Sequence, residues 1–287
     1  MTDYEGYESI VIEVEHRVVT ATVTAGPMNL ISRDLLQQFD RLVTEVSADP
    51  EPLVLVLKSG TPGFFIGHAK FSDLDVLKGE HAPTSIDDVP MNPVQSLCQR
   101  LRAMDKVSIA QVEGRATGGG AAIAMACDLR FASLESAIFN SFGVPLGTGM
   151  GGGATQLMPR LVGRARAMEL ILGAKDLDAA TADAWGYVNR ALPPDEIGMF
   201  VKGLALRISL GAPEVIRRTK RLIAEAEELA LVDGFRAENF SLQQMAGTPA
   251  AAAGVAAFLE LGGETLDGEH RLEILLGEVL ERAERNR

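Results

Sequence analysis

The stretch from Gly114 to Asp128 decides the fold, and it reads GRATGGGAAIAMACD. Residues 107–112, just before it, have the short, β-branched character of a buried strand. Residues 121–126 are small, apolar helix formers. A strand, three glycines and a helix place unpartnered backbone N–H groups at a helix N-terminus, together with the positive end of the helix dipole. Such a turn can hold a phosphate, a carboxylate or an oxyanion, although the motif taken alone also fits a tight turn packed against a sheet.

A second glycine-containing stretch favours the binding interpretation. Residues 59–68 read SGTPGFFIGH, and they follow another buried-strand run, PLVLVL, at residues 52–57. Two strand ends that both open into exposed backbone N–H groups are what an oxyanion hole with two donors requires.

Five segments resemble, in order, the crotonase (enoyl-CoA hydratase/isomerase) superfamily between about residue 8 and residue 260. The matching segments are PMNL (27–30), GFFIGH (63–68), the stretch 114–128, GGGATQLMPRLVG (151–163) and AWGYVN (184–189). The resemblance implies an α/β fold, a ClpP-like spiral of strand–strand–helix units followed by C-terminal helices. It assigns the spiral core and acyl-CoA site to residues 1–192. Residues 193–287 would then be a helical region for oligomerisation and active-site cover, giving a homotrimer or a hexamer.

Composition limits the class of protein. The 287 residues are 47% hydrophobic and 23% charged, enough for one large domain or a domain with an appendage. The net charge of −12 argues against a nucleic-acid partner, and it repels a polyanion such as coenzyme A unless basic groups gather locally. Residues 217–221, RRTKR, could meet its phosphates or form a solvated helix face.

Hydropathy and cysteine content indicate the compartment. No apolar run is long enough to span a membrane, and the acidic N-terminus is unlike a signal peptide. Cys98 and Cys127 are expected to be reduced packing residues. We therefore expect a cytoplasmic protein without a membrane partner. The resemblance implies a small-molecule substrate, no metal and no tightly bound cofactor.

Local patterns predict the main elements. Residues 9–14 and 17–23 indicate a hairpin, Ser32 the start of a helix, and Pro93 the start of another. The strand–helix–strand order predicts helices that cover a largely parallel sheet. The polar segment 71–93 is expected to form a lid or a substrate wall, with His81 in solvent.

The resemblance also implies the site. The backbone N–H groups of His68 and Gly119 would bind an acyl-thioester carbonyl and its enolate, with coenzyme A as part of the substrate. The substrate-binding candidates around them are Phe65, Ile66, Gly67, Thr117, Gly118, Gly120, Ala122, Asn140, Ser141, Gly143 and Thr148.

Two positions depart from the family pattern. Hydratases of the family place two glutamates over the α and β carbons of the substrate, at positions that in this chain hold Ala122 and Gly143. Each missing acid–base group is expected to cost roughly 10²–10⁴-fold in rate. The His68 side chain is the first candidate to replace them, because imidazole titrates near neutral pH. Gly143 is expected to hold a backbone angle that disfavours glutamate.

These observations leave three functional hypotheses. The first is an acyl-CoA enzyme that acts through a stabilised enolate, as an isomerase, a carbon–carbon lyase or a tailoring enzyme rather than a standard hydratase. The second is a cofactor-free β-diketone hydrolase of the same fold, which would ignore coenzyme A. The third is a non-catalytic acyl-binding or assembly subunit, which would bind acyl-CoA without turnover.

Overall fold

A computed structural model describes residues 2–73 and 83–285 of the chain, so His81 lies outside the described residues. The chain divides into two compact units, Met1–Lys202 and Gly203–Arg287. The division falls inside helix α7 (Ile197–Ser209), a little beyond the boundary predicted at residue 193.

The first unit is built on two β-sheets. In order across the larger sheet, the described strands are β1 (Ile10–Glu15), β2 (Val18–Val23), β3 (Val54–Ser59), β5 (Val107–Val112), β7 (Leu129–Ser133) and β10 (Arg190–Leu192). In order across the smaller sheet, they are β4 (Gly63–Phe64), β6 (Gly114–Thr117), β8 (Ile138–Asn140) and β9 (Leu177–Asp178). The described neighbours are parallel except β1 with β2 and β8 with β9.

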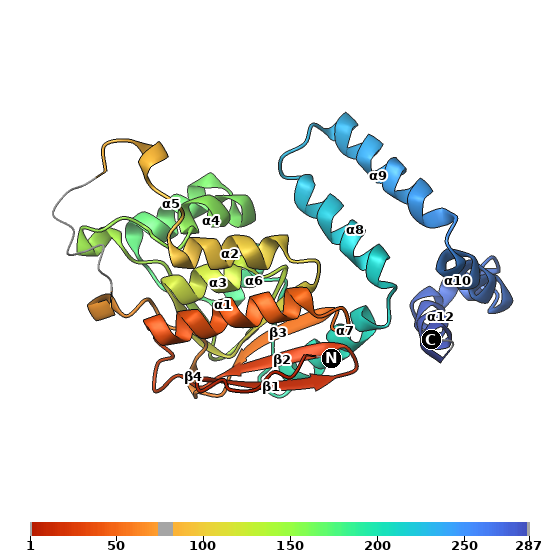
Figure 1. Cartoon of the computed structure of the whole chain (residues 1–287), viewed down its shortest axis with the longest axis horizontal. Coiled ribbons are helices and arrows are strands. Elements are labelled where there is room, and N and C mark those ends of the chain that lie inside the picture. Colours follow the sequence, from red (N-terminus) through yellow and green to blue (C-terminus); the bar gives the residue numbers. More distant parts are fainter. Residues whose placement is uncertain (1, 74–82, 286–287) are drawn as a thin grey trace. The chain divides into compact units, whose positions relative to one another are not determined.

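The chain alternates between the two sheets as a spiral. The pairs β3–β4, β5–β6 and β7–β8 each place one strand in the larger sheet and the next in the smaller one, and a helix follows each pair. The helices of this unit are α1 (Arg33–Ala48), α2 (Pro93–Ala103), α3 (Gly119–Ala126), α4 (Ala154–Val162), α5 (Arg164–Gly173) and α6 (Ala179–Ala184). Helices α1, α2 and α3 lie side by side on one side of β1, β2 and β3 (Figure 1).

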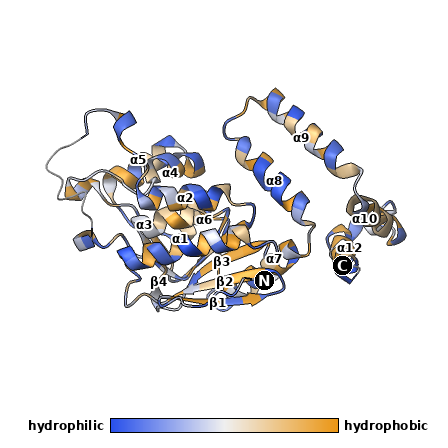
Figure 2. Ribbon diagram, viewed as in Figure 1, coloured by the Kyte–Doolittle hydropathy of each residue, from blue (hydrophilic) through white to orange (hydrophobic). Residues whose placement is uncertain are grey.

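Local chemistry explains the predicted elements. His16 and Arg17 both adopt positive φ angles, 48° and 65°, which match the twist of a tight hairpin, and β1 pairs antiparallel with β2 as predicted. Ser32 caps α1 by accepting a hydrogen bond from the Leu35 N–H at 3.1 Å. Figure 2 shows hydrophobic residues concentrated along β2 and β3, whereas α1 alternates between hydrophobic and hydrophilic residues.

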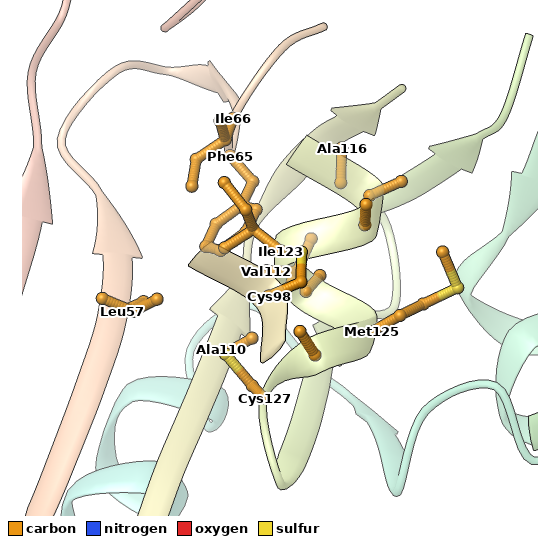
Figure 3. Packing of buried hydrophobic residues seen from close by; sticks show 14 of the residues in the cluster. Leu57, Phe65, Ile66, Cys98, Ala110, Val112, Ala116, Ile123, Met125 and Cys127 are labelled. Carbon is orange, nitrogen blue, oxygen red and sulfur yellow. The ribbon is translucent and has the colours of Figure 1, made fainter. Parts of the chain in front are cut away.

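The core surrounds α3, and every residue of that helix from Gly120 to Ala126 is buried. Figure 3 shows Ile123 packed beside Phe65 and Val112. The thiols of Cys98 and Cys127 are both buried, and these residues are 4% and 2% exposed. Burial raises the pKa of the Cys98 thiol to about 12.

The second unit is helical. After the end of α7 it contains α8 (Pro213–Glu225), α9 (Leu231–Ala246), α10 (Pro249–Glu260), α11 (Leu266–His270) and α12 (Leu272–Arg285). The basic run on α8 is largely paired within its own helix. Arg217 and Arg218 both contact Glu214, and Arg221 contacts Glu225 at 2.7 Å. Pairing of this kind is typical of a solvated helix face.

Membrane-spanning helices and clustered metal ligands are both absent from the described part of the chain. None of the described helices has the length and apolar character that crossing a bilayer requires. Within residues 2–73 and 83–285, no three His, Cys, Asp or Glu side chains cluster so as to hold a metal ion.

Candidate active site at the N-terminus of α3

The segment 65–68, which follows β4, lies between two other parts of the first unit. On one side, the N–H groups of Thr117 and Gly120 donate to the carbonyls of Ile66 and Gly67, at 3.2 and 3.1 Å. On the other side, the Gly67 N–H donates to Asn29 O at 3.1 Å, and the Ile31 N–H donates to His68 O at 3.0 Å. The two glycine-containing stretches of the sequence therefore meet at the start of α3.

Two backbone N–H groups at this junction have no acceptor among the described residues. Gly118, Gly120 and Ala122 donate to the carbonyls of Asn140, Gly67 and Gly118, respectively. In contrast, the N–H groups of His68 and Gly119 donate to no other described residue. Both residues are half-buried, at the edge of the core.

Two glycines make this junction possible. Gly118 has φ +53°, in the region that side chains disfavour, and it precedes the first residue of α3. A Cβ on Gly120 would lie 1.9 Å from the carbonyl oxygen of Ile66, so no larger residue fits without moving the backbone. The close approach of segment 65–68 to α3 depends on both positions.

Asn29 supports the same segment from beneath. It is 0% exposed and has φ +45°. Its Oδ1 accepts from the Ala25 N–H at 2.8 Å and from the Thr61 hydroxyl at 3.0 Å. Its Nδ2 donates to Phe65 O at 2.8 Å and to Ser59 Oγ at 2.9 Å. The Asn29 side chain thus ties the end of β3 to the segment that carries His68.

The His68 side chain is held in one tautomer. Its Nδ1 lies 2.8 Å from the carbonyl oxygen of Ala69, and because a carbonyl only accepts, Nδ1 carries the proton. In that tautomer, Nε2 is the ring atom that can accept a hydrogen bond. The ring is stacked on Phe71 and contacts Phe142 edge-on, with centroids 5.2 Å away in both cases.

The sequence matches a known protein family. The family model for "Enoyl-CoA hydratase/isomerase" matches residues 13–266. This chain belongs to the enoyl-CoA hydratase/isomerase (crotonase) family.

Individual relatives give the same result. A short-chain-enoyl-CoA hydratase from Clostridium acetobutylicum is 31% identical over 217 residues, 75% of this chain and 80% of the relative. A crotonyl-CoA hydratase from Syntrophomonas wolfei is 30% identical over 256 residues, 88% of this chain and 96% of the relative. Among solved structures, DspI from Pseudomonas aeruginosa superimposes with a TM-score of 0.80 at 27% identity, over 89% of this chain and 95% of that one. The predicted fold class is therefore confirmed.

The two positions that hydratases of the crotonase family are expected to fill with glutamates hold Ala122 and Gly143 in this member. Ala122 is 0% exposed, and a Cβ on Gly152 would lie 2.8 Å from its methyl group. A Cβ on Gly143 would lie 2.8 Å from Gly149 O and 3.0 Å from Met150 Sδ. Gly143 has φ −150° and ψ −37°, and our expectation of a backbone angle that disfavours glutamate stays a prediction. The obstacle to glutamate at 143 is the contact with the loop at 149–150.

The other candidates for crotonase-type substrate binding differ in accessibility. Phe65 and Ile66 are 0% exposed, so their side chains belong to the core. Gly67 and Thr117 are also buried, and they contribute through the backbone contacts described above. Thr148 closes its own loop, because its hydroxyl donates to Gly143 O at 3.2 Å.

Asn140 and Ser141 line a cavity that does not include the two free N–H donors. They border a small cavity of about 10 Å³, roughly the room of one water molecule, whose described walls do not include His68 or Gly119. Asn140 Oδ1, Ser141 Oγ and Tyr187 Oη are buried there without a hydrogen-bond partner. Burial raises the pKa of Tyr187, so its hydroxyl stays protonated and can donate. The backbone of Asn140 serves the site instead, since its carbonyl accepts from the Gly118 N–H at 2.9 Å.

Three residues near the donors were missed in the sequence of this crotonase. Asn29 lies in a quoted motif, but its polar side chain within an apolar context was given no role. Phe71 and Phe142 are 71 residues apart in the chain, and no local pattern joins them. They meet because β4 and β8 lie on either side of β6 in the smaller sheet.

Proposed function

We propose that this chain binds an acyl-CoA thioester with its carbonyl oxygen between the N–H groups of His68 and Gly119, and that it stabilises the enolate of that thioester. The observation that carries the proposal is the pair of N–H groups that donate to no described residue at a junction where neighbouring N–H groups are paired. Backbone donors aimed at a developing oxyanion are worth about 3–4 kcal/mol each in transition-state stabilisation.

The proposed chemistry excludes efficient hydration. A hydratase needs a base to activate water, and positions 122 and 143 carry no carboxylate. Enolate formation by double-bond isomerisation or by cleavage of a carbon–carbon bond remains compatible with the site. The removal of the α proton from the thioester, and the return of a proton to the enolate, are assigned to His68 Nε2, because the bond from Nδ1 to Ala69 O leaves that atom free.

The first experiment measures hydration of crotonyl-CoA. The protein should be at least about a hundredfold slower than the Syntrophomonas wolfei crotonyl-CoA hydratase assayed in parallel, the lower end of one acid–base contribution. Comparable rates would contradict the proposed chemistry. In that case His68→Ala, which keeps the backbone donor, should abolish hydration.

A second experiment tests the oxyanion hole itself by comparing Gly119→Pro with Gly119→Ala. Gly119 is the first residue of α3, a position where helices accept proline. Both variants add a Cβ beside Ile31 Cδ1, but only proline removes the N–H. We expect acyl-CoA turnover, or exchange of the α proton in deuterated water, to fall about 10²–10³-fold further in the proline variant than in the alanine variant. Equal activity in the two variants would show that the Gly119 N–H takes no part in the oxyanion hole.

The same exchange assay separates the remaining hypotheses. An acyl-binding subunit would bind acyl-CoA and exchange no α protons with any thioester. A β-diketone hydrolase would cleave diketones and show no stabilisation by coenzyme A in a thermal-shift screen. Exchange that depends on His68 supports the proposed enolate chemistry.

A further inference from the structure

The small cavity in the first unit brings together three polar side chains whose hydrogen-bonding needs are not met. Its described walls come from β8 and the residue after it, from α4, α5 and β9, and from the turn before β10. Asn140 Oδ1, Ser141 Oγ and Tyr187 Oη are all buried, and none has a hydrogen-bond partner among residues 2–73 and 83–285. Burying a polar atom without a partner destabilises a fold, so three of them around one cavity point to a bound molecule.

The Asn140 carboxamide has a fixed orientation. Its Nδ2 donates to Ala174 O at 3.1 Å and to Asp176 Oδ1 at 2.8 Å. A backbone carbonyl only accepts, so the nitrogen and not the oxygen of the carboxamide has to contact Ala174. Asn140 Oδ1 is therefore the atom on the cavity side, and it requires a hydrogen-bond donor.

The two hydroxyls complete a set of partners that suits one water molecule. Ser141 and Tyr187 can each donate or accept, and burial raises the pKa of Tyr187, so that its hydroxyl keeps its proton. A water has two protons and two lone pairs. It can donate to Asn140 Oδ1 and to one hydroxyl while it accepts from the other. Three hydrogen bonds are typical of a buried water.

The size and charge of the cavity exclude other small ligands. A volume of about 10 Å³ is roughly the room of one water molecule. Its described walls include Lys175 and no acidic residue, and the ammonium group of Lys175 disfavours a bound cation. The remaining described walls are apolar or aromatic, and they offer an anion no further donor.

We propose that one water molecule is bound between Asn140, Ser141 and Tyr187, and that it holds the end of β8 in place beside Gly118. The backbone carbonyl of Asn140 accepts from the Gly118 N–H at 2.9 Å, and Gly118 immediately precedes Gly119. A bond from the water to the Asn140 side chain therefore restrains the residue that fixes Gly118. This inference needs no thioester, so it stands or falls independently of the proposed function.

A crystal structure of the unaltered full-length protein tests the site directly. We expect density for one water oxygen at about 2.6–3.2 Å from at least two of the three polar atoms. Density that lies within reach of only one of them, or of none, would overturn the proposal.

The sign of a stability change gives a second test, in solution. Tyr187→Phe and Ser141→Ala each remove one hydroxyl. If the hydroxyls bond to a water, each variant should unfold at a lower urea concentration than the wild type. A hydroxyl without any partner is itself destabilising, so its removal would leave the urea midpoint unchanged or raise it, and that result would overturn the proposal.

The matched control for the two hydroxyl variants is Ser133→Ala. Ser133 Oγ is also buried without a described partner, but Ser133 is not among the described walls of the cavity. This variant should not lower the urea midpoint. A fall equal to that of Tyr187→Phe and Ser141→Ala would assign the loss to the removal of any buried hydroxyl and would overturn the site.

Hydrogen exchange tests the link to Gly118. In the double variant Tyr187→Phe/Ser141→Ala, Asn140 Oδ1 is the one cavity partner that remains, fewer than the two to four that hold a buried water. The Gly118 N–H should then exchange about 2- to 12-fold faster, the equivalent of one hydrogen bond, after correction for the change at Ala21. Ala21 lies within β2, between β1 and β3, and its exchange reports opening of the whole unit. An equal change at both amides would show that the water does not hold Gly118.

Discussion

Asn29 is the residue on which the position of the free donors depends. Its carboxamide bonds to Ala25, Ser59, Thr61 and Phe65, and its backbone carbonyl receives the Gly67 N–H. Replacement by alanine leaves several of these buried groups unsatisfied, at about 1–3 kcal/mol each. We expect Asn29→Ala to lower the free energy of unfolding by roughly 2–5 kcal/mol, measured by urea denaturation.

The control for Asn29→Ala is Asn189→Ala. Asn189 is exposed, and its Oδ1 accepts from the Arg130 N–H at 2.7 Å, away from the donors. This variant should lose about 0.5–1.5 kcal/mol and keep its affinity for acyl-CoA, whereas Asn29→Ala should lose affinity as well. Equal losses of stability in the two variants would show that the carboxamide of Asn29 contributes no more to stability than that of Asn189.

Part of the site could be predicted at this scale and part could not. The glycine stretches predict where backbone donors become available, because a chain without Cβ atoms exposes its N–H groups locally. The contacts of Phe71 and Phe142 depend on which strands are neighbours in the smaller sheet, which no stretch of residues specifies. The same holds for Asn140 and Ser141, whose side chains meet Tyr187 across a cavity rather than the substrate position.

At the scale of single elements, α1 ends at a titratable residue that is bonded to the N-terminal segment. Asp49 caps this helix and is 3% exposed. Burial alone would raise its pKa, but the N–H groups of Glu51 and Thr2 donate to its carboxylate, at 3.0 and 2.7 Å, and hold the pKa at about 2.

This depressed pKa predicts a pH dependence of stability. An unfolded aspartate titrates near 3.9, so the stabilisation is fully present above that value and is lost as the pH falls toward 2. Asp49→Asn should therefore be less stable than the wild type at pH 7, and the difference should shrink between about pH 4 and pH 2. Denaturation curves at several pH values would measure this difference. A gap that stays constant over the range would assign the effect to packing rather than to charge.

The helices and strands show how far local patterns reach. Caps and turns are short-range features, so the hairpin at His16–Arg17 and the helix that starts after Ser32 lie where they were predicted. Short strands such as β9 and β10 exist because their partners are present. The division within α7 is equally invisible in sequence, since the helix continues through it.

For the whole molecule, the second unit leaves apolar side chains uncovered. On α9, Leu231, Phe235 and Leu242 share one face and are 72%, 60% and 58% exposed. A helix face of this kind needs a partner surface. We predict a closed assembly, a trimer or a dimer of trimers, in sedimentation at micromolar concentration.

Charge on that face should break the assembly. Leu231→Glu combined with Phe235→Glu should shift the protein to smaller species, while Arg236→Glu, on an exposed side chain that pairs with Asp233, should not. A wild-type protein that sediments as a monomer would refute the prediction.

The burial of Cys98 and Cys127 has a consequence for handling and for measurement. Thiol–disulfide exchange requires a thiolate, and burial keeps the Cys98 sulfur protonated and out of reach. The folded protein should therefore resist mixed disulfides with the free thiol of coenzyme A. Exchange with a chromogenic disulfide begins only when the layer formed by α2 and α3 opens. The rate at which the two sulfurs react therefore reports how often this layer opens, without any label added to the chain.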